Sequence, residues 1–137
     1  MKKLDSQNLF KAFSLEGDSL NELPVIPDDS FILFGTVLKG VESFYLIDQL
    51  YQMRYKDQYE LVREKIKLKY FSGLMKYIHR IDNISVDTVL YIEDEFGEQA
   101  IQYALEEMLQ FFEQIEYYEE CIILKKYFDI FFDKKLV

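Results

Sequence analysis

The sequence predicts an all-α fold, in which residues 1–137 form a single-domain bundle of five or six helices. Only two prolines and five glycines occur, too few for the many turns of an all-β domain. Half of the residues are apolar, and they recur at steps of three and four along long segments, as on one face of a helix. A chain of this length is able to bury a sizeable core as one domain.

Residues 1–27 are predicted to form a less regular N-terminal arm. Its apolar residues are interrupted by Pro24 and Pro27, which prevent a continuous helix. We expect the arm to pack its apolar side chains on the body of the protein. The alternative is a detachable arm that binds a partner.

Two helices are expected in the next segment. Asp28, Asp29 and Ser30 are N-cap candidates before a strongly apolar run. Gly40 weakens a continuous helix, so the first helix is expected to end or kink there. The second helix is then expected over residues 41–53, and a short strand is the alternative for the first.

Residues 55–81 are predicted to form the longest helix, in the middle of the bundle. Apolar residues lie on two of its sides, which is typical of a helix packed between neighbours. Gly73 is expected to let another backbone approach closely. The lysines lie along the borders of the apolar stripes, where their long stems cover apolar surface.

The segment after this helix contains capping residues. Asp82 and Asn83 are predicted to end the long helix, and Ser85 is predicted to cap the next one. Residues 86–92 are partly β-branched, so helix and strand both stay open there. Asp94 is the expected cap of the helix that follows.

Residues 98–133 are predicted to form an acidic antiparallel helical hairpin. The first arm has apolar residues at helical spacing, namely Ile101, Ala104, Leu105, Met108, Leu109 and Phe112. The second arm has a narrower seam of Tyr117, Cys121, Leu124, Phe128 and Phe131. The apolar phase shifts near residues 114–116, which predicts the joint there. One continuous helix is the alternative, because the joint contains neither Gly nor Pro.

The net charge of the chain lies entirely in its C-terminal part. Residues 1–84 contain twelve basic and twelve acidic side chains, whereas residues 85–137 contain four basic and thirteen acidic ones. No Lys or Arg occurs between Arg80 and Lys125. Such a layout favours contact with a basic surface, on another protein or on a second copy. The residues predicted to bind this partner are Glu106, Glu107, Glu113, Glu116, Glu119 and Glu120.

A sequence pattern lies within the hairpin. Leu-Glu-Glu-Met at 105–108 is followed by Ile-Glu-Tyr-Tyr-Glu-Glu-Cys-Ile-Ile-Leu-Lys at 115–125. Residues 105–128 thus resemble the UVR-type helical hairpin of the bacterial excision-repair subunits B and C. The family pattern has two alanines in place of Cys121-Ile122 and Arg-Asp in place of Lys125-Lys126. The resemblance implies a hairpin that docks on another protein and has no enzymatic activity.

The sequence shows no catalytic or metal-binding constellation. His79 and Cys121 are the single residues of their types, whereas zinc and di-iron sites need several such ligands. Cys121 lies on the predicted seam, which predicts a buried, inert thiol. The acids at 93–95 lack the alternating pattern of a calcium loop. We therefore expect no enzyme activity, no cofactor and no metal.

The leading hypothesis is a non-enzymatic protein–protein interaction module: an adaptor, regulator or inhibitor that docks the acidic hairpin on a basic partner. The alternatives are a small self-associating structural or virion component, and an acidic decoy of a nucleic-acid-binding groove. Direct binding of nucleic acid is disfavoured by the negative charge. A lone cysteine and the lack of a long apolar run favour a cytoplasmic protein without membrane contact. The residue usage suits an AT-rich bacterial or phage genome.

Overall fold

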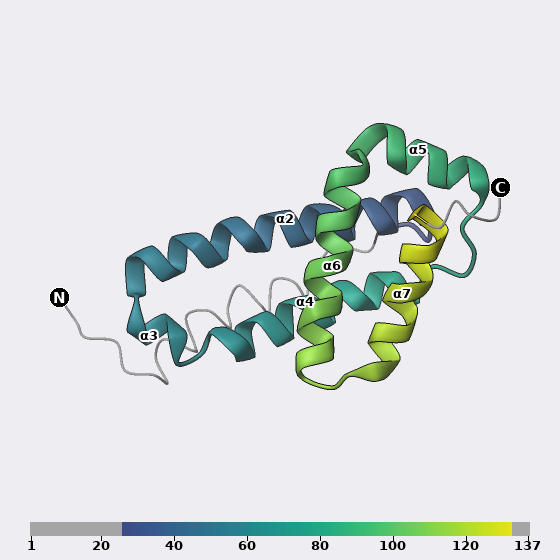
Figure 1. The fold of residues 1–137 in the computed structure, drawn as a ribbon. Helices are drawn as coiled ribbons and strands as arrows, with labels where there is room; N and C mark the ends of the chain where they lie inside the picture. The colour runs from purple at the N-terminus through teal and green to yellow at the C-terminus, as the bar shows by residue number, and fades with distance from the viewer. Residues whose placement is uncertain (1–25, 133–137) are drawn as a thin grey trace.

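A computed structural model of the protein describes residues 26–132, which form six helices and no strand (Figure 1). The all-α prediction is thereby confirmed for this part of the chain. The predicted arm over residues 1–27 lies almost wholly outside it. In chain order, the helices are α2 (Ser30–Tyr55), α3 (Asp57–Glu60), α4 (Arg63–His79), α5 (Val86–Phe96), α6 (Glu98–Gln114) and α7 (Tyr118–Phe132).

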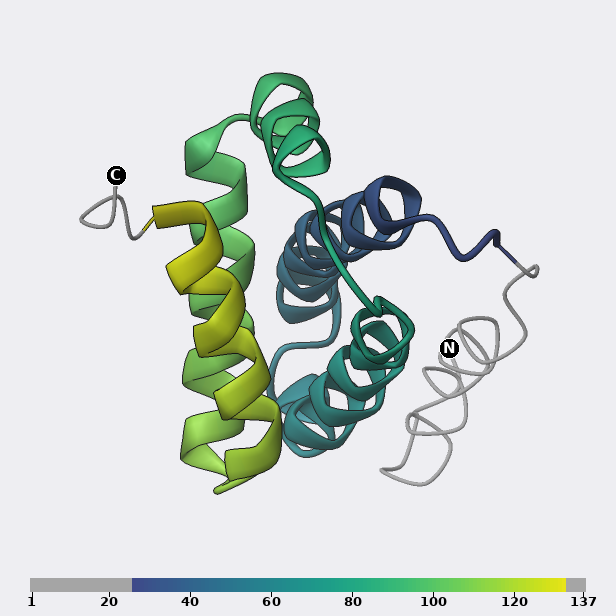
Figure 2. The same ribbon diagram turned by 90° about the vertical axis from the view of Figure 1, so that its right-hand side faces the viewer.

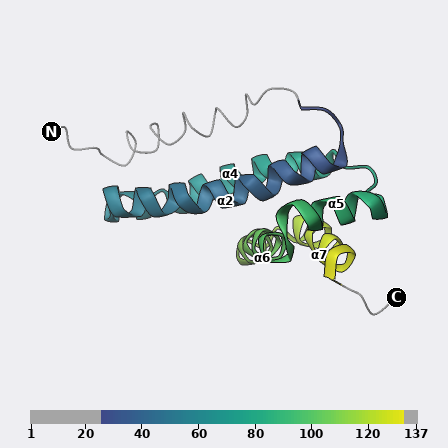
Figure 3. The ribbon, with the colours of Figure 1, turned by 90° about the horizontal axis from the view of Figure 1, so that it is seen from above.

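The helices form two antiparallel pairs that pack as two layers. The α2–α4 pair forms one layer, and the α6–α7 pair crosses it in the other (Figures 1 and 2). Seen from above, α5 lies next to α2, on the same side of the α2–α4 pair as α6 and α7 (Figure 3). The end of the α2–α4 pair that lies away from α5 includes α3, and it projects beyond α6 and α7 (Figure 1).

The longest helix is α2, which takes the central place predicted for residues 55–81. Its N-cap is Asp29, whose carboxylate accepts a hydrogen bond from the Ile32 N–H at 3.1 Å. The predicted break at Gly40 is wrong, because α2 passes through it without interruption. A Cβ on Gly40 would lie 2.5 Å from Leu74 Cδ2, so the glycine lets α2 and α4 approach closely.

The predicted single helix over residues 55–81 is also wrong. Lys56 adopts a positive φ of 49° after α2 ends, α3 is one short turn, and Leu61 and Val62 separate it from α4. These residues turn the corner between the antiparallel helices. Gly73 makes no close approach either, since a Cβ there would meet nothing within 4 Å.

Gly40 and Gly73 give opposite predictions for substitution by alanine. Gly73→Ala should raise the free energy of unfolding by about 0.5–1 kcal/mol, because alanine has the better helix propensity. Gly40→Ala should lower it by about 1 kcal/mol, because overpacking against the buried Leu74 outweighs that gain. Urea unfolding followed by circular dichroism measures both. Equal stabilisation by the two variants would contradict the close approach of α2 and α4.

The length and composition of α2 also meet those of a membrane-spanning helix, which the sequence analysis did not expect. Core helices of other proteins meet the same criteria. Many of its apolar side chains are packed on the other helices, and it carries the buried Asp48 in its C-terminal half. Packing in the core accounts for part of this composition, whereas Leu46, Leu50 and Met53 of α2 are exposed.

Aromatic rings fill much of the core that joins the two layers. Phe34 of α2 is fully buried, and its ring centroid lies 5.4 Å from that of Tyr127 and 5.0 Å from that of Phe131 on α7. Phe71 of α4 meets Phe111 of α6 edge to face at 5.5 Å. The aromatic side chains therefore tie each layer to the other.

The predicted hairpin is confirmed as the α6–α7 pair, with its joint at residues 115–117. Most of the predicted seam is buried, except that Leu109 and Phe128 are half-buried and Tyr117 is exposed. The seam prediction missed Phe111 and Tyr127, which are both buried.

The boundary before the hairpin differs from the prediction. Residues 86–92 are helical, as part of α5, and Ser85 caps this helix by accepting from the Thr88 N–H at 3.1 Å. Asp94 does not cap α6, because α5 continues to Phe96. Gly97, with a φ of 83°, separates the two helices, and this left-handed conformation favours glycine.

Candidate interaction surface

The joint between α6 and α7 carries three of the six glutamates that were predicted to bind a partner. Glu113, Glu116 and Glu119 are exposed there. Tyr117 and Tyr118 lie between the last two of them in sequence and are 45% and 61% exposed. We call these five residues the hairpin end. In Figure 1 it lies at the end of α6 opposite to α5.

The other three glutamates make contacts within the chain. Both carboxylate oxygens of Glu120 lie 3.2 Å from Nε2 of His79, which is on α4. Glu106 accepts a hydrogen bond from Gln102 Nε2 at 2.9 Å. Glu107 lines a cleft beside α2 and α4. Three of the six predicted residues therefore already have neighbours on this chain, and their role in binding a partner stays a prediction.

The conformation of the hairpin end is fixed by local contacts. Glu116 has a φ of 62°, and the Tyr117 N–H donates to the Phe112 carbonyl at 2.8 Å. The Tyr117 ring stacks on the Phe112 ring with centroids 6.0 Å apart. Phe112 is fully buried, so the joint is tied to the core.

Cys121, the single cysteine of the sequence, lies near this surface, and its predicted burial is confirmed. Burial raises the pKa of the thiol, and the negative charges of Glu113 and Glu120 act in the same direction. A raised pKa disfavours the thiolate, which is the nucleophilic form. The thiol is therefore poorly suited to covalent chemistry.

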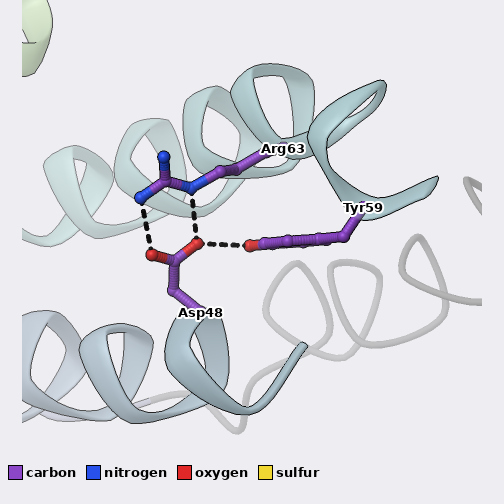
Figure 4. A network of polar contacts seen from close by, with 3 residues as sticks. All are labelled: Asp48, Tyr59 and Arg63. Atoms are coloured by element: carbon purple, nitrogen blue, oxygen red, sulfur yellow. Dashed lines mark hydrogen bonds and ion pairs between the residues drawn. The ribbon is translucent and has the colours of Figure 1, made fainter. Parts of the chain in front are cut away.

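Asp48 of α2 is a buried charged residue that the sequence analysis missed (Figure 4). Its two carboxylate oxygens accept from Nε and Nη2 of Arg63 at 2.9 and 2.8 Å. The Tyr59 hydroxyl donates to the same carboxylate at 2.6 Å. The signal in the sequence was an acid that follows Val41 and Phe44 at helical spacing on the apolar face of α2.

The protonation states of this cluster suit a structural role. Burial by itself would raise the pKa of Asp48, but hydrogen bonds from Arg63 and Tyr59 outweigh it, and the pKa is lowered. Burial and the neighbouring Asp48 raise the pKa of Tyr59, and the hydrogen bond to Asp48 raises that of Arg63. None of the three groups is thus tuned to exchange a proton near neutral pH.

A polar cleft lies beside this cluster, where α6 crosses α2 and α4. It consists of two hollows of about 130 and 270 Å³ that share Arg63 and Lys67. The Lys67 ammonium lies 5.5 and 5.3 Å from the ring centroids of Phe71 and Phe111. Each hollow is smaller than the ~300–1,000 Å³ of ordinary ligand pockets, so neither is assigned to a small molecule.

Tyr103 of α6 closes one side of the cleft. Burial raises the pKa of its hydroxyl to about 12, with further contributions from Glu107, Tyr45 and Asp48. The hydroxyl therefore stays neutral. Within residues 26–132, no three Asp, Glu, His or Cys side chains converge so as to hold a metal ion.

The chain matches no protein-family model, no curated protein and no solved structure. The resemblance of residues 105–128 to the UVR-type hairpin stays a prediction, although these residues do form most of the α6–α7 pair.

Besides the two tyrosines of the hairpin end, exposed apolar side chains gather on α2 and on α5. On α2 they form a stripe of Leu46, Leu50 and Met53 near the projecting corner. On α5 they are Val86, Leu90 and Tyr91. Apolar groups that are exposed together often belong to surfaces that contact other molecules.

Proposed function

We propose that the protein is a non-enzymatic interaction module, an adaptor, regulator or inhibitor, whose hairpin end docks on a basic surface of a partner protein. The observation that supports this most is the composition of the hairpin end. It exposes three carboxylates and two tyrosines within residues 113–119, a segment without Lys or Arg.

The two residue types have complementary roles in such a contact. Exposed carboxylates increase the rate of encounter with a basic surface and disfavour partners of the wrong sign. Tyrosine buries a large ring with few rotatable bonds and is frequent among the residues that dominate binding energy. Within the described residues, no ion pair engages Glu113, Glu116 or Glu119, so their charges are available to a partner.

The fixed conformation of the joint supports the same proposal. A surface held in one conformation loses less entropy on binding than a flexible loop does. The stacking of Tyr117 on Phe112 and the hydrogen bond at the joint provide this order before any partner arrives.

The proposal is tested by neutralising the hairpin end. A variant with Glu113→Gln, Glu116→Gln and Glu119→Gln should capture its partner from a lysate of the source cells at least about tenfold less well than the unmodified chain. The captured protein should be basic on its contact surface and should be released by salt. Mass spectrometry measures the captured amounts.

A matched control neutralises three exposed acids elsewhere. Asp57→Asn, Glu64→Gln and Asp82→Asn change the net charge by the same amount and should leave capture unchanged. Equal loss in both variants, or no loss in the hairpin variant, would refute the hairpin end as the contact. Sedimentation of the unmodified chain at low and high salt shows whether the partner is a second copy.

A further inference from the structure

The outer face of α5 combines apolar and acidic side chains in an ordered way. At about 100° per residue, Val86 and Leu90 lie along one edge and Tyr91 along the other, with Asp87 and Asp94 between them. The three apolar side chains are 76%, 56% and 68% exposed. Together with Glu95, which is also exposed, they form what we call the α5 face.

The opposite side of α5 anchors the helix, which fixes the direction of this face. Ile92 is fully buried, and the Phe96 ring packs so closely on Gly35 that a Cβ there would lie 2.9 Å from its Cζ. Phe96 also contacts Phe31, with ring centroids 6.0 Å apart. The α5 face therefore cannot turn inward without removing these side chains from the core.

The charge of the α5 face is not compensated within residues 26–132. Asp87, Asp94 and Glu95 take part in no ion pair there. Lys39 lies near the inner side of α5, over the Phe96 ring at 5.9 Å, and it pairs with Glu42. An uncompensated acidic face repels the phosphates of nucleic acids and anionic lipids and attracts a basic peptide.

We propose that the α5 face binds a basic amphipathic helix of a partner protein. The apolar side of that helix packs on Val86, Leu90 and Tyr91, and its Lys or Arg side chains pair with Asp87 and Asp94. This mode of recognition joins an apolar contact to charges that select the partner and set its orientation. The site is distinct from the hairpin end, because the two lie at opposite ends of α6, about 25 Å apart along its axis.

A synthetic peptide tests the α5 face on the full chain. The probe is a peptide of about five helical turns made of Leu and Lys, with all leucines on one face. Its affinity is measured by titration calorimetry at low and at high salt. Leu90→Ser with Tyr91→Ser should lower the affinity about tenfold or more, because two exposed apolar contacts are lost. Asp87→Asn with Asp94→Asn should lower it as well and weaken its dependence on salt.

Two controls separate this proposal from general attraction to an acidic protein. Leu46→Ser with Leu50→Ser removes two exposed leucines of α2, of which Leu50 is as exposed as Leu90, and should leave the affinity unchanged. Glu116→Gln with Glu119→Gln alters only the hairpin end and should also leave it unchanged, which keeps this test independent of the proposed function.

Three results would overturn the proposal. The first is binding within about twofold of the unmodified chain after the change at Leu90 and Tyr91. The second is equal binding of a peptide with the same composition but with its leucines spread around the helix. The third is a loss in the α2 control as large as in the α5 variant. Circular dichroism of each variant establishes that the helices are retained.

Discussion

Phe34→Ala is expected to lower the free energy of unfolding by about 3–5 kcal/mol, the largest effect among the substitutions considered. Phe34 is fully buried on α2 and contacts Tyr127 and Phe131 of α7 with ring centroids 5.4 and 5.0 Å apart. Removal of the Phe34 ring leaves a cavity between the two layers, next to the rings of Tyr127 and Phe131. Chemical denaturation followed by circular dichroism measures the loss.

The control for this prediction is an aromatic residue of α7 that contributes little to the core. Tyr118 is 61% exposed, so Tyr118→Ala should change the free energy of unfolding by less than about 0.5 kcal/mol. A loss below about 1 kcal/mol for Phe34→Ala would mean that α2 and α7 are not packed as described. The expected loss of about 3–5 kcal/mol is a large part of the stability of a small domain. The Phe34→Ala variant should therefore also be partly unfolded at 37 °C.

The hairpin was predictable from sequence because its signals are local. The apolar residues of each arm repeat at helical spacing, and the change of phase between them marks the joint. The caps at Asp29 and Ser85 were predictable for the same reason, since a cap depends on residues within one turn.

The misplaced helix boundaries depended on contacts that no local pattern contains. Whether a glycine breaks a helix or permits close packing depends on what lies opposite, and Leu74 is 34 positions beyond Gly40 in the sequence. The corner after α2 is made at Lys56, a residue type with no preference for a positive φ. Spacing alone therefore favoured one long helix over residues 55–81.

The helical hairpin that carries the candidate site was predictable from sequence, whereas the contacts of its glutamates within the chain were not. Sequence placed six glutamates on one hairpin, but helical spacing does not reveal partners on other helices. The contact of Glu120 with His79 spans 41 positions, and the cleft that Glu107 lines is formed by α2 and α4. What distinguishes the hairpin end is that its three glutamates take part in no ion pair within the described residues.

Asp48→Ala is expected to lower the free energy of unfolding by about 2–3 kcal/mol. Removing one member of a buried pair leaves the other charge without a partner, which costs about 3–5 kcal/mol when both groups are fully buried. The Arg63 side chain is 36% exposed, so water compensates part of its loss. Exchanging Asp48→Leu together with Arg63→Met should cost less than Asp48→Ala alone, because no uncompensated charge then remains.

The pair of Asp48 and Arg63 also makes the stability of the protein depend on pH in the acid range. The pKa of Asp48 is lower in the folded protein than its ordinary value of 3.8, so the folded state favours the ionised form. Its contribution is complete above the ordinary pKa and is lost as the pH falls through the lowered one. Between about pH 5 and pH 2, the free energy of unfolding should therefore fall less steeply for Asp48→Asn than for the unmodified chain.

Asp82→Asn is the control for this acid dependence, since Asp82 is exposed in the loop after α4. Its profile should follow that of the unmodified chain. If Asp48→Asn kept the full acid dependence, the carboxylate would not be held by Arg63 and Tyr59, and the corner between α2 and α4 would need another support.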